Sequence, residues 1–71
     1  MILVEFGTYK DGFKKIAEVQ SEDELAEFLA SFFQQKNITP YYVREWAYED
    51  GYNYYDYGSH TNFIRYKIMV L

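Results

Sequence analysis

The sequence contains no cysteine, only one proline and only one histidine, and these absences exclude several classes of protein. Without cysteine the chain forms neither disulfides nor thiolate zinc sites. One histidine also excludes a metal site built on two histidines of the same chain, and we expect no cofactor. A domain of 71 residues buries only about 60% of the surface that its unfolded chain exposes. Its stability must therefore come from a dense aromatic core or from self-association.

Positive charge is also scarce, because seven Lys and Arg stand against eleven Asp and Glu, for a net charge of -4. Proteins that bind nucleic acid nonspecifically depend on cations that neutralise phosphates, so a nucleic-acid partner is disfavoured. The apolar opening MILVEF is interrupted by Glu5 and is too short for a signal-peptide core or a membrane span. We therefore expect a single domain over residues 1–71, cytoplasmic and without a membrane partner.

Strand-forming patterns occupy much of the chain. Alternating apolar, β-branched and aromatic residues predict strands over residues 2–9, 13–19, 41–48 and 63–70. Asp11-Gly12 predicts a hairpin between the first two strands. In the second strand no single phase separates apolar from charged side chains. Residues 52–57 follow Asp50-Gly51 and form either a short fifth strand or part of a long loop.

A single helix is predicted between the second and third strands. Ser21 and Glu24 fit the capping box that begins a helix, while Asn37 and Pro40 predict its end. The helix has one apolar stripe, made of Leu25, Phe28, Leu29, Phe32 and Phe33. The order β-β-α-β-β predicts an α+β fold, in which one helix packs on one face of an antiparallel sheet.

The face of this sheet that the helix leaves uncovered is the predicted site of self-association. Its candidate residues are too apolar for a face that only meets water. We therefore predict a homodimer interface formed by Leu3, Ile16, Phe63, Arg65, Lys67 and Met69.

Tyrosines are concentrated in the second half of the chain, where seven of the nine lie between Tyr41 and Tyr57. Tyrosine offers a large contact area at low entropic cost, which is why binding loops are rich in it. The alternative is that these rings line the rim of a small core. The predicted binding surface consists of Trp46, Tyr52, Tyr54, Tyr55, Tyr57 and His60. Within it we expect Tyr54 or Tyr55 to reach solvent, and residues 56–60 to form a turn before the last strand.

Three functions follow from these features. The first is a non-enzymatic module that dimerises and presents the tyrosine-rich segment to an unidentified protein. The second is a binder of single-stranded nucleic acid or carbohydrate that stacks its ligand on Tyr52, Tyr54, Tyr55 and Tyr57, with polar contacts from Arg44, Arg65 and Lys67.

The third function is a hydrolase that uses Asp56, Ser59 and His60. Adjacent Ser59 and His60 on an extended chain point to opposite faces, which is poor geometry for a nucleophile and its base. We therefore predict that the protein is not an enzyme.

Overall fold

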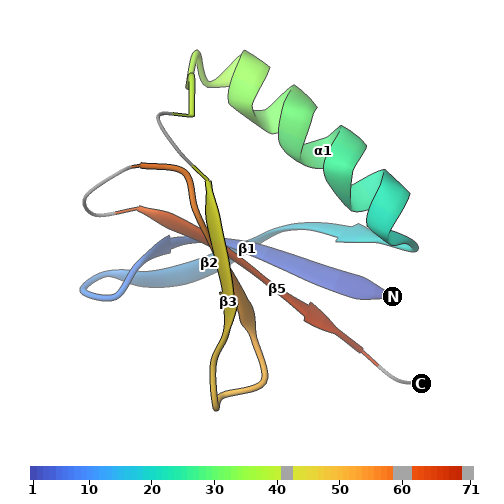
Figure 1. Ribbon diagram of the computed structural model, residues 1–71, viewed down its shortest axis with the longest axis vertical. Coiled ribbons are helices and arrows are strands. Elements are labelled where there is room, and N and C mark those ends of the chain that lie inside the picture. Colours follow the sequence, from blue (N-terminus) through green and yellow to red (C-terminus); the bar gives the residue numbers. More distant parts are fainter. Residues whose placement is uncertain (41–42, 59–61, 70–71) are drawn as a thin grey trace.

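The computed structural model describes residues 1–40, 43–58 and 62–69. These residues form one helix and one antiparallel sheet of five strands, as Figure 1 shows. The elements in chain order are β1 (Ile2–Thr8), β2 (Gly12–Val19), α1 (Glu22–Gln35), β3 (Arg44–Ala47), β4 (Asn53–Asp56) and β5 (Phe63–Ile68). The α+β prediction is confirmed, and residues 52–57 contain the possible additional strand, which is β4.

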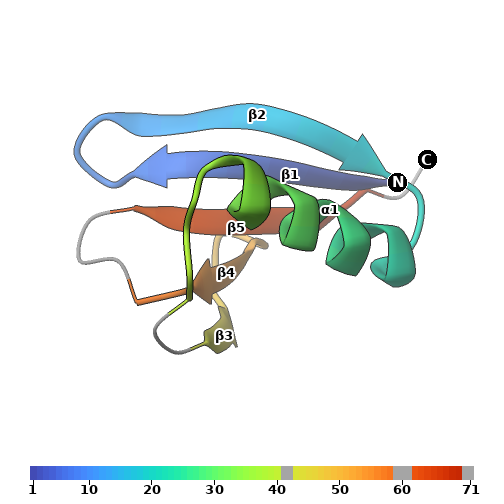
Figure 2. The same ribbon diagram turned by 90° about the horizontal axis from the view of Figure 1, so that it is seen from above.

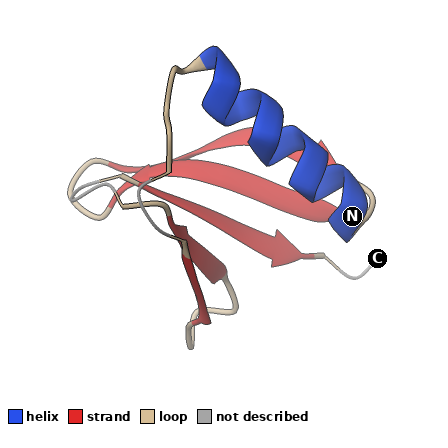
Figure 3. Cartoon of the chain, turned by 45° about the horizontal axis from the view of Figure 1, so that its top comes forward, coloured by secondary structure: helices blue, strands red, loops and turns tan. Residues whose placement is uncertain are grey.

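The last strand joins two hairpins into one sheet. The strand order is β2-β1-β5-β4-β3, so β5 lies between the β1–β2 hairpin and the β3–β4 hairpin. The helix α1 runs across one face of this sheet (Figure 2). The β3–β4 hairpin is turned steeply away from the β1–β2 hairpin and extends beyond the helix (Figure 3). One helix therefore covers one face, and covers it only in part.

The ends of α1 follow the sequence signals. Ser21 is the N-cap, and its Oγ accepts a hydrogen bond from the Glu24 backbone N–H at 3.2 Å. The Glu24 carboxylate accepts from the backbone N–H of Gln20, one residue before the partner that a capping box prescribes. At the other end Asn37 has a φ of 55°, the left-handed conformation that closes a helix. The predicted helix bounds are confirmed.

The core lies between α1 and the sheet. Four residues of the predicted helix stripe are buried, and Phe28 is half-buried. Phe32 meets the ring of Phe6 edge to face, with centroids 5.2 Å apart. Val4 and Ile64, on the adjacent strands β1 and β5, have no exposed surface. The buried core cluster consists of Ile2, Val4, Val19, Leu25, Leu29, Phe32, Phe33, Tyr57 and Ile64.

A β-bulge explains why β2 shows no single phase in the sequence. The β1–β2 register shifts between Val4 and Glu5: Val4 pairs with Ala17, while Glu5 pairs with Lys15. Ile16 is the extra residue on β2. Ala17 and Val19 therefore face the helix, and Phe13 and Lys15 face the opposite way. Ile16 packs against the helix-side core, so its prediction as an uncovered interface residue was wrong.

The third and last strands are shorter than predicted. Residues 41–42 and 70–71 lie outside the described residues, and β3 begins at Arg44. It ends at Ala47 because Tyr48 enters a turn, where its carbonyl accepts from the Gly51 N–H at 3.1 Å. Gly51 has a φ of 86°, which favours glycine at this position.

Within the described ranges, no helix combines the length and the apolar character needed to cross a lipid bilayer.

Replacing Phe32 with Ala should lower the free energy of unfolding by about 3–5 kcal/mol, since it removes a buried ring and leaves a cavity. This is a large part of the stability of a domain of this size. Chemical denaturation followed by circular dichroism measures the change. Phe28→Ala is the matched control, and it should cost less because Phe28 is only half-buried. Equal unfolding midpoints for Phe32→Ala and the parent would contradict the packing described here.

Candidate functional site

The face of the sheet that points away from α1, which we call the open face, carries a cluster of aromatic and charged side chains. The register places Leu3 opposite Lys67, Glu5 opposite Arg65 and Gly7 opposite Phe63, all on this face. Gly7 leaves no space for a side chain, since a Cβ there would lie 2.1 Å from the Gly12 carbonyl oxygen. Because Gly7 has no side chain, β1 and β2 can approach each other closely there, beside Phe63.

Arg65 lies at the centre of the open face. Its Cζ atom is 4.1 Å from the ring centroids of both Phe13 and Tyr52. Its Nε donates to the Glu5 carboxylate at 2.7 Å, and one terminal nitrogen donates to the Tyr54 hydroxyl at 3.3 Å. Burial alone would lower the pKa of Arg65, but the hydrogen bonds with Tyr54 and Glu5 outweigh it and raise the pKa. The group is thus a fixed cation between aromatic rings.

Tyr54 connects this cation to the β3–β4 turn. Only 2% of its surface is exposed, and its hydroxyl donates to the Asp50 carboxylate at 2.7 Å. Its ring is stacked with those of Trp46 and Tyr9, at centroid distances of 5.8 Å in both cases. Burial raises the pKa of Tyr54, and the same hydrogen bond lowers the pKa of Asp50. Glu5, Arg65, Tyr54 and Asp50 therefore form one continuous polar chain inside the aromatic cluster.

The outer rings of the cluster reach solvent. Tyr9 is 63% exposed and Tyr48 is 54% exposed, although both contact the buried Tyr54 ring. Trp46 is half-buried, and the Arg44 guanidinium lies 5.5 Å from its ring centroid. We call these four residues, Tyr9, Arg44, Trp46 and Tyr48, the aromatic rim. The rim is held in place by packing and is partly exposed to solvent.

The predicted tyrosine surface does not form as one unit. Tyr52 and Tyr54 lie on the open face, whereas Tyr55 pairs with Ile64 and packs toward the helix side. Tyr57 is part of the buried core. The prediction that Tyr54 or Tyr55 reaches solvent was wrong for Tyr54, and Tyr55 is half-buried. The four rings therefore offer no common stacking platform, because they belong to opposite faces of the sheet.

Of the other predicted interface residues, four lie on the open face and Met69 lies beyond the last strand. Leu3, Phe63, Arg65 and Lys67 share the open face, as predicted. Phe63 contributes to the aromatic cluster and contacts the rings of Tyr9 and Trp46. Met69 lies beyond the end of β5, where it is partly exposed and its backbone N–H donates to the Met1 carbonyl.

The proposed hydrolytic residues are only partly described. Ser59 and His60 lie outside the described residues. Asp56 is buried, and its carboxylate accepts from the Gly58 backbone N–H at 2.9 Å. Gly58 has a φ of 97°, a conformation that favours glycine. Asp56 and Gly58 therefore form the first part of the turn predicted over residues 56–60. No group of three or more His, Cys, Asp or Glu side chains in the described part of the chain is placed to hold a metal ion.

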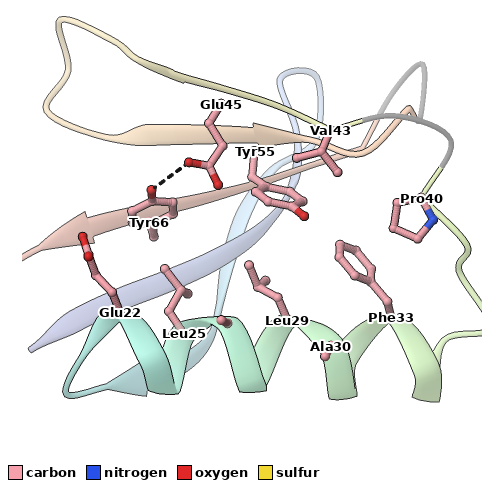
Figure 4. Close-up of a pocket in the computed structure, with 11 residues that line it drawn as sticks. Glu22, Leu25, Leu29, Ala30, Phe33, Pro40, Val43, Glu45, Tyr55 and Tyr66 are labelled. Atoms are coloured by element: carbon pink, nitrogen blue, oxygen red, sulfur yellow. Dashed lines mark hydrogen bonds between the residues drawn. The ribbon is translucent and has the colours of Figure 1, made fainter.

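A groove on the helix side is a feature that the sequence analysis missed. It has a volume of about 600 Å³ and lies between α1 and strands β3, β4 and β5 (Figure 4). Its lining consists of Glu22, Leu25, Ala26, Leu29, Ala30, Phe33, Pro40, Val43, Glu45, Tyr55 and Tyr66. The only signal in the sequence was that one helix is narrower than a five-stranded sheet. That signal does not indicate where the groove forms.

Comparison with known proteins adds no family: no family model matches the chain, and neither a curated protein nor a solved structure matches it significantly.

Replacing Tyr54 with Phe should destabilise the fold by about 1–2 kcal/mol at neutral pH, since the hydroxyl links Arg65 to Asp50. Because the pKa of Asp50 is lowered in the folded state, its contribution is fully present above its ordinary value of 3.8. The contribution is lost as the pH falls through the folded pKa. The stability difference between the parent and Tyr54→Phe should therefore narrow in acid.

Denaturant unfolding at several pH values tests this expectation. Tyr48→Phe removes the same hydroxyl from an exposed tyrosine of the same cluster and is the matched control, with an expected change within about 0.5 kcal/mol. Equal effects of the two substitutions, or a Tyr54→Phe effect that is constant down to strong acid, would contradict the role given to the Tyr54 hydroxyl.

Proposed function

We propose that the protein is a small non-enzymatic interaction module that forms a homodimer through its open face. The observation that carries this proposal is the aromatic rim, where exposed rings are fixed against a buried tyrosine on a face that no described helix covers. Tyrosine, tryptophan and arginine are the residue types most enriched at interface hot spots. Rings that are already ordered lose little conformational entropy on binding.

The charges of the open face support contact with a second copy. A two-fold dimer brings one patch against itself, so an unbalanced charge there would repel. On this face Arg65 pairs with Glu5, Arg44 with Asp56, and Lys15 with Glu18. The fourth cation described on this face, Lys67, is in none of these ion pairs and lies 5.3 Å from the Tyr52 ring centroid. By contrast, α1 begins with three acidic residues, Glu22, Asp23 and Glu24. For an acidic chain, the open face is thus the less self-repulsive of the two sides.

The edges of the sheet favour a contact through the face instead of pairing between strands. The edge strand β3 has only four residues and begins with Arg44 and Glu45. The other edge strand, β2, carries Lys14 and Lys15 next to its bulge. Short strands, charged residues and bulges are the features that prevent edge-to-edge pairing.

A protein partner and a cytoplasmic location are proposed from the sequence. The dimer would leave the half-buried Tyr55, on the helix side, to contact a protein partner. The absence of cysteine is compatible with a reducing compartment such as the cytoplasm. Stacking of single-stranded nucleic acid or carbohydrate on the four tyrosines 52, 54, 55 and 57 is not favoured, because these rings lie on opposite faces.

Sedimentation equilibrium from about 5 to about 500 μM should show a dimer, since this range populates any dimer with a dissociation constant up to about 500 μM. Tyr48→Ser should weaken the dimer about tenfold or more, as expected for an aromatic residue in an interface, while leaving the melting temperature nearly unchanged. Ile68→Ser is the matched control, since Ile68 is 56% exposed but pairs with Ile2 on the helix side. A parent that is monomeric throughout this range, or equal effects of the two substitutions, would rule out the proposal.

A further inference from the structure

The helix-side groove has an apolar floor formed by both layers of the fold. Leu25, Leu29 and Phe33 of α1 face Tyr55 and Tyr66 of the sheet across it (Figure 4). The rings of Phe33 and Tyr55 are 6.0 Å apart, centroid to centroid. The groove exists because the β3–β4 hairpin extends past the helix (Figure 3). Its volume of about 600 Å³ is within the range of small-molecule sites in proteins.

The two ends of the groove differ in chemistry. In Figure 4 Tyr66 lies between Glu22 and Glu45 at one end, while Phe33, Pro40 and Val43 lie toward the other end. The Tyr66 hydroxyl donates to the Glu45 carboxylate at 3.5 Å. The groove is therefore amphipathic along its length, with acidic groups and a hydroxyl at one end and apolar side chains at the other.

Neither carboxylate, Glu22 or Glu45, has an ion-pair partner among the described residues. Their negative potential extends into the groove: the pKa of Tyr66 is raised by burial and then by Glu45 and Glu22. The pKa of Tyr55 is raised by burial and by Glu45. A cation at this end would be attracted by both carboxylates and by the face of the Tyr66 ring.

We propose that this groove binds a small amphipathic amine, whose apolar chain or ring lies along Leu25, Leu29 and Phe33 and whose cationic head lies between Glu22 and Glu45. An anionic amphiphile of the same length would place its head against the same carboxylates and would be repelled. The site is on the opposite side of the sheet from the aromatic rim. The proposal therefore holds or fails independently of the homodimer.

Titration of the protein with octylamine, followed by backbone amide shifts in nitrogen-15 spectra, tests the proposal directly. Octanol and octanoate are the matched probes, because all three compounds have eight carbons and carry different head groups. Octylamine, a cation at neutral pH, should bind about fivefold more tightly than octanol, the ratio expected for a partly exposed charge pair, and octanoate should bind more weakly than both. The shifts should concentrate on the groove residues.

Two pairs of variants separate the head-group contact from the apolar contact. Glu45→Gln should weaken octylamine binding about threefold without changing octanol binding, whereas Glu49→Gln, in the exposed β3–β4 turn, should change neither. Ala30→Leu places a larger side chain in the groove and should weaken both ligands, whereas Ser31→Leu, on α1 but outside the groove lining, should weaken neither.

Equal binding of octylamine, octanol and octanoate would overturn the proposal, as would an Ala30→Leu variant that binds octylamine like the parent. A dilution series of the protein without ligand tests whether a second copy of the chain occupies the groove. If dilution alone shifts the groove residues, a second copy of the chain occupies the groove, and the amine proposal is wrong.

Discussion

The position of the Arg65 guanidinium is the constraint on which the open face depends. A single helix cannot cover both faces of this sheet, so the other face needs its own means of excluding water. Arg65 provides it from the central strand β5, because its guanidinium lies between the rings of Phe13 and Tyr52 and bonds Glu5 and Tyr54. These contacts connect β1, β2, β4 and β5. A guanidinium can perform this role where an aliphatic side chain cannot. Its planar face stacks on aromatic rings, while the N–H groups at its edge donate hydrogen bonds.

The helix-side half of the fold could be predicted from the sequence because its signals are local. The helix caps, the apolar stripe and the alternation of Ile2, Val4 and Phe6 all depend on neighbours within a few residues. The phase of β2 could not be predicted, since the bulge depends on how β1 pairs with it. A bulge moves every later residue of a strand to the other face. Ile16 was therefore assigned to the wrong side, although its neighbours Ala17 and Val19 follow the pattern correctly.

The tyrosine-rich segment shows the limit of composition as a guide to a site. Its density of rings indicated a surface, but alternation along β4 sends Tyr54 and Tyr55 to opposite faces. Trp46 and Asp50 contact Tyr54 from within the same hairpin, but distant residues complete its burial: Tyr9 and Phe13 from the first hairpin and Arg65 from β5. The contacts with the first hairpin and with β5 are not local enough to be predicted from the segment itself. The exposed rim therefore contains Tyr9 and Tyr48, which sequence reasoning left out, instead of Tyr54.

The two sides of the sheet differ in charge, and this difference bears on the proposed dimer. Acidic residues concentrate on α1 and at one end of the groove, whereas the cations Arg65, Arg44 and Lys15 of the open face are each paired locally. A head-to-tail contact of the open face against α1 would gain attraction mainly at Lys67, because Arg65, Arg44 and Lys15 are already paired. It would also leave one aromatic rim of every pair exposed. Such contacts would continue into an open filament unless the rotation between successive copies closed a ring. Contact between two open faces would bury both rims in a closed dimer, so the pairing of most cations within the open face supports the proposed closed dimer over an open assembly.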